Sequence, residues 1–346
     1  MISNPIARLP KQDSASAPRL LILSHKDIVE LLDLDTCIAS VEEAFRAHGN
    51  GQVMPAGFLH VDTANGGFHI KTGGLNSPTA YFGLKANARF MENREKYGLP
   101  NVQGLIYLAD GDCGTPLAIM DSIHITGLRT AAATAVAARF LAPHGPAVVT
   151  VCGCGTQARI QLAAISKVRT IVKAYAYARS DDHMRAFSLQ MSDELGIPVE
   201  PSPRLAQATL KSNIILTCTP ARRFYLCAAD VRPGTFISAI GSDSVGKQEL
   251  EPQLLAQSKV VVDILDQAAH VGELHYALEL GLMQRSDVYA ELGQIVAGHK
   301  PGRISEDETI LFDSTGTALQ DVAAASAVYV RAMKASCGVC VPLREP

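Results

Sequence analysis

Two kinds of hydrophobic pattern divide the chain. From residue 52 to about residue 120, short β-prone runs such as FHIKTGG, YFGLKANA and PLAIMD alternate with clusters of Gly, Pro, Asn and Asp. This pattern predicts the sheet of a mixed α+β domain. After Gly127, apolar strands such as PAVVTV, SNIILTCT and KVVVDIL alternate with helical segments. That alternation predicts a parallel sheet covered by helices on both faces.

Local signals fix several element ends. Leu20 to Leu23 reads as a short strand, and Ser24 follows it as a helix N-cap, with Asp27 in the first turn. A second helix is predicted from Asp35 to His48, where glycines follow. Further helices are predicted for LRTAAATAVAARFLA, for residues 268–280 and 285–297, and for GTALQDVAAASAVYVRAMKAS.

Composition excludes several classes of protein. The 346 residues are 47% hydrophobic and 19% charged, with a net charge of −3 and no basic run, so a nucleic-acid partner is not expected. No uninterrupted apolar stretch is long enough to span a membrane, and residues 1–18 lack a secretory signal. Eight cysteines, several within apolar runs, suggest free thiols in the cytoplasm. Cys337 and Cys340 have metal-like spacing without further ligands nearby, so no metal site is predicted.

The strongest local motif is Gly153-x-Gly155-x-x-Ala158, which lies between an apolar strand and a helix. In such a fingerprint the first glycine permits a tight turn, the second lets the backbone approach a pyrophosphate, and the third small residue lets helix and strand pack closely. Thr156 and Gln157 then begin a helix whose free N–H groups can receive the phosphates. These residues predict a dinucleotide-binding turn.

The next strand ends at Ala178, Arg179 and Ser180, where the adenosine ribose is expected. An NAD site usually carries an acidic residue here, whereas a guanidinium and a hydroxyl suit a 2′-phosphate. The sequence therefore favours NADP(H), and NAD(H) stays open. Asp181 and Asp182 are read as the start of the next helix.

Five blocks in order resemble the signature segments of the ornithine cyclodeaminase/μ-crystallin family: GLKANARFMENREKYGLPNVQG, PLAIMDSIHITGLRTAAATAVAARFLA, CGCGTQAR, AIGSDSVGKQELEP and FDSTGTALQDVAAA. The resemblance extends from about residue 20 to residue 335. It implies a homodimer and an α/β fold, with a Rossmann dinucleotide-binding domain (127–315) inserted into an α+β catalytic and dimerisation domain (1–126 and 316–346). It also implies hydride exchange between a nicotinamide and the α-carbon of a small amino or imino acid.

The resemblance assigns roles to individual residues. Lys85 matches the family's catalytic-domain lysine, which binds a carboxylate or moves a proton if burial lowers its pKa. Arg129, placed at the start of the alanine-rich helix, matches the arginine that binds the substrate carboxylate, and Thr130 matches a phosphate contact. Asp243 matches the aspartate near the substrate nitrogen. Nearby, Lys247 has no assigned role.

The chain lacks one positively charged residue that many family members carry. Many members carry an arginine shortly after a Met-Pro pair, but this sequence continues from Met54 and Pro55 with Ala-Gly-Phe. We hypothesise that Lys71 replaces the lost cation in substrate binding, the alternative being a solvated surface lysine. His69 and His275 are acid–base groups by type only.

These observations lead to one preferred activity and several alternatives. We expect NAD(P)H-dependent reduction of a small cyclic or acyclic α-imino acid, such as Δ1-pyrroline-2-carboxylate, to the L-amino acid. The alternatives are an ornithine cyclodeaminase that recycles bound NAD, an alanine or aspartate dehydrogenase, and a μ-crystallin-like binding protein. Lys85, Arg129 and Asp243 together argue against the last, because binding alone needs no proton-relay groups.

Overall fold

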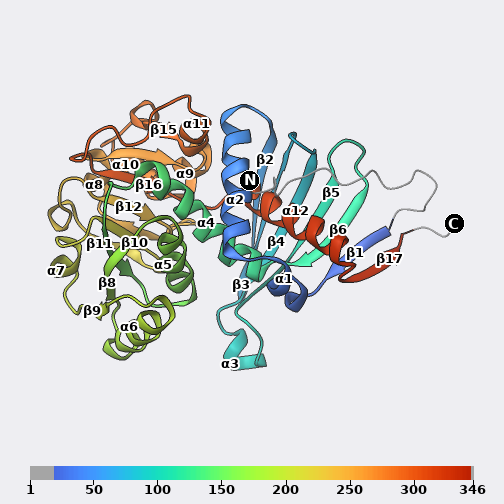
Figure 1. Ribbon diagram of the computed structural model, residues 1–346, viewed down its shortest axis with the longest axis horizontal. Coiled ribbons are helices and arrows are strands. Elements are labelled where there is room, and N and C mark those ends of the chain that lie inside the picture. Colours follow the sequence, from blue (N-terminus) through green and yellow to red (C-terminus); the bar gives the residue numbers. More distant parts are fainter. Residues whose placement is uncertain (1–18, 344–346) are drawn as a thin grey trace. The chain divides into compact units, whose positions relative to one another are not determined.

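A computed structural model describes residues 19–343 of the chain (Figure 1). The chain divides into two compact units, Met1–Arg129 with Thr317–Pro346 and Thr130–Gly316. Residues 1–18, which we expect to lack a secretory signal, lie outside the described residues. Among residues 19–343, no helix combines the length and the apolar character needed to cross a membrane.

The first unit contains a seven-stranded sheet in the order β17-β1-β6-β5-β4-β3-β2. Neighbouring strands run antiparallel, except for β1 and β6, which run parallel. The strands are β1 (Arg19–Leu23), β2 (Val53–Thr63), β3 (Gly66–Leu75), β4 (Tyr81–Arg89), β5 (Val102–Asp110), β6 (Pro116–Asp121) and β17 (Val339–Pro342).

Helices cover one face of this sheet. The long C-terminal helix α12 packs on β3, β4 and β5 and against α2, and Figure 1 shows it lying across the strands. The helices are α1 (His25–Leu31), α2 (Leu34–Gly49), α3 (Asn93–Tyr97) and α12 (Ala318–Ala335). The face away from α12 carries exposed apolar side chains, 41–54% accessible, at Leu59, Val61, Phe68 and Leu105.

The predicted N-cap is confirmed. Ser24 Oγ accepts the backbone N–H of Asp27 at 3.3 Å, and Asp27 Oδ2 accepts the backbone N–H of Ser24 at 2.8 Å, which completes a capping box. No local pattern predicts β17, which pairs with β1 although the two strands lie at opposite ends of the chain. Such a pairing depends on tertiary contacts rather than on local pattern.

The second unit contains an eight-stranded sheet, all parallel, in the order β15-β14-β16-β12-β10-β7-β8-β9. From β7 the chain first builds outward through β8 and β9, and then continues on the other side of β7 with β10 and β12. This is the strand order of a Rossmann fold, whose ligands bind beyond the carboxyl ends of the strands where the order reverses. The predicted α/β fold class is confirmed.

The strands of this unit are short, and three of them, β10, β12 and β16, are buried at every residue. They are β7 (Ala147–Cys152), β8 (Ile171–Tyr177), β9 (Val199–Pro201), β10 (Ile214–Thr217), β12 (Phe236–Ala239), β14 (Lys259–Val262), β15 (Ala290–Glu291) and β16 (Ile310–Asp313). Two more, β11 (Arg222–Leu226) and β13 (Gln248–Leu250), form a small separate sheet that the sequence did not predict.

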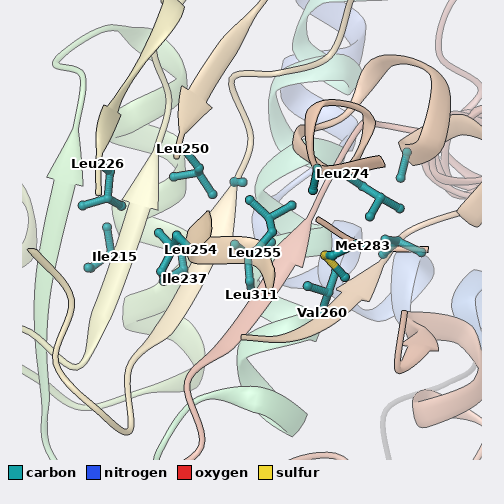
Figure 2. Packing of buried hydrophobic residues seen from close by; sticks show 14 of the residues in the cluster. Ile215, Leu226, Ile237, Leu250, Leu254, Leu255, Val260, Leu274, Met283 and Leu311 are labelled. Atoms are coloured by element: carbon teal, nitrogen blue, oxygen red, sulfur yellow. The ribbon is translucent and has the colours of Figure 1, made fainter. Parts of the chain in front are cut away.

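Helices α4 (Ile123–Leu141), α5 (Thr156–Val168), α6 (Asp181–Leu195), α7 (Leu205–Thr209), α8 (Pro252–Ala256), α9 (Leu265–Val271), α10 (Glu273–Glu279) and α11 (Leu292–Val296) accompany the strands, with 3₁₀ turns η1 (Ala228–Asp230) and η2 (Arg285–Asp287). Figure 2 shows the core in which α8 and α10 contribute Leu254, Leu255 and Leu274, next to Ile237 and Leu311 of the sheet. Continuous apolar strands are buried because helices cover them.

Three helical predictions are wrong in detail. The helix expected over 268–280 is broken at Gly272, whose missing Cβ would lie 2.4 Å from Asp313 Oδ2. The segment 285–297 holds a 3₁₀ turn, the strand β15 and a short helix, because tertiary pairing with β14 overrides local propensity. The alanine-rich helix begins at Ile123 and includes Gly127, so Arg129 lies in its second turn rather than at its start.

Candidate active site

A row of four residues crosses the α12-facing side of the first sheet. Lys71 of β3 lies directly opposite Lys85 of β4, with Phe58 of β2 and Ile106 of β5 at either end of the row. Lys71 Nζ lies 5.7 Å from the centre of the Phe58 ring. Lys71 and Lys85 are only 8% and 4% exposed. Both are therefore buried, although lysine side chains are usually exposed to solvent.

Glycines on the same side of the sheet let α12 approach closely. A Cβ added to Gly83 would lie 2.5 Å from Val322 Cγ2, and one added to Gly73 would lie 3.2 Å from Ala318 Cβ. A larger residue at either position would push the helix away from the strands. The approach brings Asp321, on the N-terminal half of α12, down to the sheet.

Asp321 is the centre of a buried ion cluster. Lys85 Nζ donates to Asp321 Oδ1 at 2.9 Å and lies 2.8 Å from Oδ2. Arg129 Nε lies 2.9 Å from Asp321 Oδ1, and Arg129 Nη1 donates to Gln320 Oε1 at 2.8 Å. Since Asp321 is 2% exposed and Arg129 5%, solvent contributes little to this pairing.

The carboxylate of Asp321 forms ion pairs with two cations, Lys85 and Arg129, and the charge of Lys71 acts on both Lys85 and Asp321. Burial lowers the pKa of Lys85 to about 7, with Asp321 opposing that shift and the positive charges of Arg129 and Lys71 adding to it. Burial raises the pKa of Asp321, but the attraction of Arg129 and Lys85 outweighs it and leaves this pKa below its usual value. The arrangement therefore favours a further negative charge and supplies an amine that titrates near neutrality.

The side-chain amide of Gln320 adds an unsatisfied buried donor to the cluster. Among the described residues, Gln320 Nε2 has no hydrogen-bond partner although its side chain is fully buried. Buried polar groups are nearly always paired, and an exception calls for an explanation. An amide N–H next to Arg129 is suited to the oxygen of a bound anion.

The sequence analysis identified Lys85, Arg129 and Lys71 but missed Asp321 and Gln320. The signal was present in the run ALQDVAAASAVYV, where the adjacent Gln320 and Asp321 interrupt a mostly apolar helix. A carboxylate in such a helix is almost never fully buried unless it is paired. Its partners, Lys85 and Arg129, lie 236 and 192 residues away, so the sequence alone could not name them.

The structure places His69 on the same side of the sheet as Lys71, two residues along β3. His69 Nδ1 lies 3.1 Å from His60 Nδ1, and His60 Nε2 lies 2.8 Å from Asp62 Oδ1. His275 Nδ1 lies 3.2 Å from the carbonyl oxygen of Ala269 in the second unit. All eight cysteines lie within residues 19–343 and are unbridged, and no metal-binding group of three or more ligands occurs in that range.

The dinucleotide turn has the geometry that its fingerprint predicts. Gly153 follows β7 with φ of +104°, and a Cβ there would lie 2.9 Å from the carbonyl oxygen of Cys218. Gly155 is the N-cap of α5, and a Cβ there would meet open space. Ala158 is fully buried. Packing thus explains Gly153 and Ala158, whereas a side chain at Gly155 would meet no atom of the protein.

The other dinucleotide candidates lie on α5, on α4 and after β8. Thr156 is exposed and Gln157 half-buried in the first turn of α5. Thr130 is buried within α4, next to Arg129 in the chain. Ala178, Arg179 and Ser180 follow β8, where Arg179 is exposed and Ser180 caps α6 by accepting the backbone N–H of His183 at 3.3 Å. The predicted reading of Asp181 and Asp182 as the helix start is confirmed.

Asp243 belongs to the second unit, in the loop after β12. It forms an ion pair with Lys247, which gives that lysine a partner the sequence did not indicate. The Asp243 side chain is 53% exposed. The next regular element after Asp243 is the strand β13.

A sequence profile of the ornithine cyclodeaminase/mu-crystallin family matches residues 19–336. The chain belongs to this family. The match covers both units and includes every site residue described above. The predicted resemblance is therefore confirmed over nearly the whole chain.

Three solved structures of similar proteins cover almost all of this family member. An archaeal alanine dehydrogenase dimer with bound NAD is 36% identical, with a TM-score of 0.88 over 94% of this chain and 100% of that one. A Δ1-pyrroline-2-carboxylate reductase of Thermococcus litoralis, in complex with NADH and L-proline, is 33% identical (TM-score 0.87; 92% and 99% covered). An iminosuccinate reductase of Paracoccus denitrificans, in complex with NAD⁺, is 31% identical (TM-score 0.87; 93% and 99% covered).

The ion cluster yields a stability prediction. Asp321→Asn should lower the free energy of unfolding at pH 7 by about 3 kcal/mol, because Arg129 then lacks its buried counter-charge. This is the lower end of the range for removing one partner of a buried ion pair. We expect the lower end because Lys85 can release its proton and become neutral. Urea unfolding measures it, with Asp62→Asn at an exposed carboxylate as the control. Adding Lys71→Met should restore part of the loss, and a loss below about 0.5 kcal/mol would contradict the electrostatic account.

Proposed function

We propose that this protein reduces a small α-imino acid to the corresponding L-amino acid with a nicotinamide dinucleotide. The observation that carries the proposal is the buried carboxylate of Asp321, which pairs with two buried cations, Lys85 and Arg129. The positive charge of Lys71 also acts on this pair. A buried excess of positive charge is costly unless an anion joins it. The carboxylate of an imino acid is such an anion, and the unpaired Gln320 amide supports the same assignment.

Each residue of the cluster has a role in this proposal. Arg129 and Lys71 bind the substrate carboxylate, the arginine through its planar fork of donors. Lys85, whose pKa of about 7 lets it carry or release a proton at neutral pH, gives a proton during reduction and takes one during oxidation. Asp321 holds the Lys85 amine in place through contacts of 2.8 and 2.9 Å.

The second unit binds the dinucleotide in this proposal. Gly153, Gly155, Thr156, Gln157 and Ala158 form the turn for its pyrophosphate. Thr130 provides a further phosphate contact. A reduced nicotinamide, when bound, supplies the hydride that the imine carbon accepts. The carboxylate of Asp243 stabilises the positive charge of the iminium nitrogen.

NADP(H) is the preferred cofactor in this proposal, and NAD(H) is a second substrate. Ala178 supplies no carboxylate to repel a 2′-phosphate, and Arg179 is exposed at the end of β8. The three similar structures contain NAD or NADH, so a preference for NADP(H) would distinguish this chain from them. Comparing the reaction rates with NADPH and NADH tests this preference.

Reductive amination of an oxo acid is the second candidate function. An oxo acid with ammonia forms an acyclic imine, which needs the same carboxylate site and the same hydride. The similarity to an archaeal alanine dehydrogenase, at 36% identity over 94% of the chain, favours it. A cyclic imine as substrate is supported by the similarity to the Δ1-pyrroline-2-carboxylate reductase.

We further propose a cytoplasmic homodimer. The side of the first sheet that faces away from α12 exposes Leu59, Val61, Phe68 and Leu105, and contiguous exposed apolar side chains mark interaction surfaces. The similar alanine dehydrogenase is a dimer. Eight unbridged cysteines are consistent with a reducing compartment.

The reaction is tested by following loss of the reduced nicotinamide absorbance. We expect oxidation of NADPH faster than of NADH with Δ1-pyrroline-2-carboxylate or Δ1-piperideine-2-carboxylate, and compare pyruvate or oxaloacetate with ammonia. Lys71→Met should raise KM for the imino acid about tenfold, with a smaller change in kcat, because it removes one carboxylate contact. Lys173→Met, at a lysine that pairs with Glu200, is the control.

Three outcomes would contradict parts of this proposal. Activity only with an oxo acid and ammonia would replace imine reduction by amino-acid dehydrogenation. Ammonia release from ornithine with catalytic NAD would make the chain a cyclodeaminase. An unchanged KM in Lys71→Met would remove that lysine from the site.

The pH dependence of the reaction follows from Lys85. Its amine is a cation below pH about 7, so kcat/KM for imine reduction should fall as pH rises through about 7, and amino-acid oxidation should rise over the same range. Lys71→Met removes a positive charge that lowers the pKa of Lys85, so both midpoints should move to higher pH. Rate profiles from pH 5 to 10 measure this, and unmoved midpoints would exclude Lys85 as the titrating group.

The proposed dimer surface gives its own prediction. Leu59→Lys combined with Leu105→Lys should convert the dimer to a monomer in sedimentation velocity, because two charges on the apolar face would be buried without partners. Leu189→Lys, at a leucine of α6 that is 76% exposed, is the matched control and should leave the sedimentation coefficient unchanged. A dimer that survives the double substitution would place the interface elsewhere.

A further inference from the structure

A buried carboxylate in the second unit joins loops at the carboxyl ends of two neighbouring strands. Glu249 is fully buried, and its two oxygens accept from different segments. Oε1 accepts the backbone N–H and the hydroxyl of Thr219, each at 2.6 Å, just beyond β10. Oε2 accepts the backbone N–H of Gly241 at 2.8 Å, just beyond β12.

The same glutamate closes the loop that carries Asp243. Gly241 and Glu249 are the two ends of this loop, and the Glu249 side chain connects them directly. Ser242, which is 1% exposed, donates its hydroxyl to the carbonyl oxygen of Lys247 at 2.7 Å and closes a smaller ring inside it. Asp243 follows immediately within that ring.

The closure depends on close packing and on a second carboxylate. A Cβ on Gly241 would lie 2.3 Å from Glu249 Oε2, so only glycine permits the approach. The backbone N–H of Glu249 itself donates to Glu273 Oε1 at 2.7 Å, and that of Leu250 donates to Glu273 Oε2 at 3.2 Å. Both the side chain and the backbone of Glu249 are therefore held.

Residue 249 needs two oxygen acceptors, which a carboxylate has and an amide does not. Both oxygens of Glu249 face backbone N–H groups, and Oε1 also receives the Tyr225 hydroxyl at 2.8 Å. A glutamine of the same shape would turn its NH₂ group toward the donors of either Thr219 or Gly241. One loop or the other would then lose its acceptor while it stays buried.

We propose that Glu249 is a positioning residue that fixes the 241–249 loop and, through it, Asp243. This inference rests on the proposed function only for the role of Asp243; the closure itself is independent of it. Glu249 is fully buried, and its two oxygens already accept donors from Thr219, Tyr225 and Gly241, so it acts through the loop and not as a catalytic residue. Its loss should leave the fold in place but move the Asp243 carboxylate.

The test combines a kinetic and a structural readout on the full-length protein. Glu249→Gln should lower kcat for imine reduction about tenfold or more, and backbone amides of residues 241–247 should exchange with deuterium faster. Asp243→Asn should also lower kcat, and the double variant Asp243→Asn/Glu249→Gln should be within about twofold of Asp243→Asn alone, because both act through one carboxylate. Glu251→Gln is the matched control, since Glu251 accepts one backbone N–H, from Ala228, which an amide oxygen can still receive.

The outcomes separate the inference from the proposed function. Unchanged amide exchange in the loop would overturn the closure, and multiplicative losses in the double variant would overturn the action through Asp243. If Glu249→Gln does not fold, Tyr225→Phe removes one donor to Oε1 and should raise loop exchange in the same direction. If the wild type reduces none of the imines, the proposed function fails while the exchange measurement still tests the closure.

Discussion

The pairing of one buried carboxylate with two buried cations is the constraint on which the first unit depends. Asp321 could not lie inside the helix–sheet interface without Lys85 and Arg129, and neither cation could be buried without it. The glycines at positions 73 and 83 serve this pairing, because they bring α12 to the strands. A core made only of apolar residues would hold the helix without the free-energy cost of removing charges from water.

The proposed chemistry gives a reason for keeping these buried charges despite their desolvation cost. Lys71 adds a third cation beside Lys85, and together with burial this charge lowers the pKa of Lys85 to about 7. In the proposed function, the same repulsion that destabilises the cluster favours a substrate carboxylate and provides an amine that can exchange protons at neutral pH. Stability and chemistry are in conflict at these residues, as is common at functional sites.

The second unit uses buried carboxylates differently. Glu249, Glu273 and Asp313 accept backbone N–H groups from loops and helix starts, and burial raises the pKa of each. For Asp313 that pKa is about 7. These residues satisfy backbone donors that tight loops leave unpaired. Loop geometry at the carboxyl ends of the parallel strands is thereby set by a few acidic side chains.

The sequence by itself determined the elements with strong local signals and the residues with a family pattern. The Ser24 cap, the parallel strands and the turn at Gly153 follow from local sterics, hydrogen bonding and hydrophobic period, which neighbouring residues decide. Only the tertiary structure decided the pairing of β17 with β1, the break at Gly272, and the meeting of Lys85 with Asp321 across 236 residues. Those features depend on contacts between segments that are far apart in the chain. A local sequence pattern does not specify which distant segment a residue will contact.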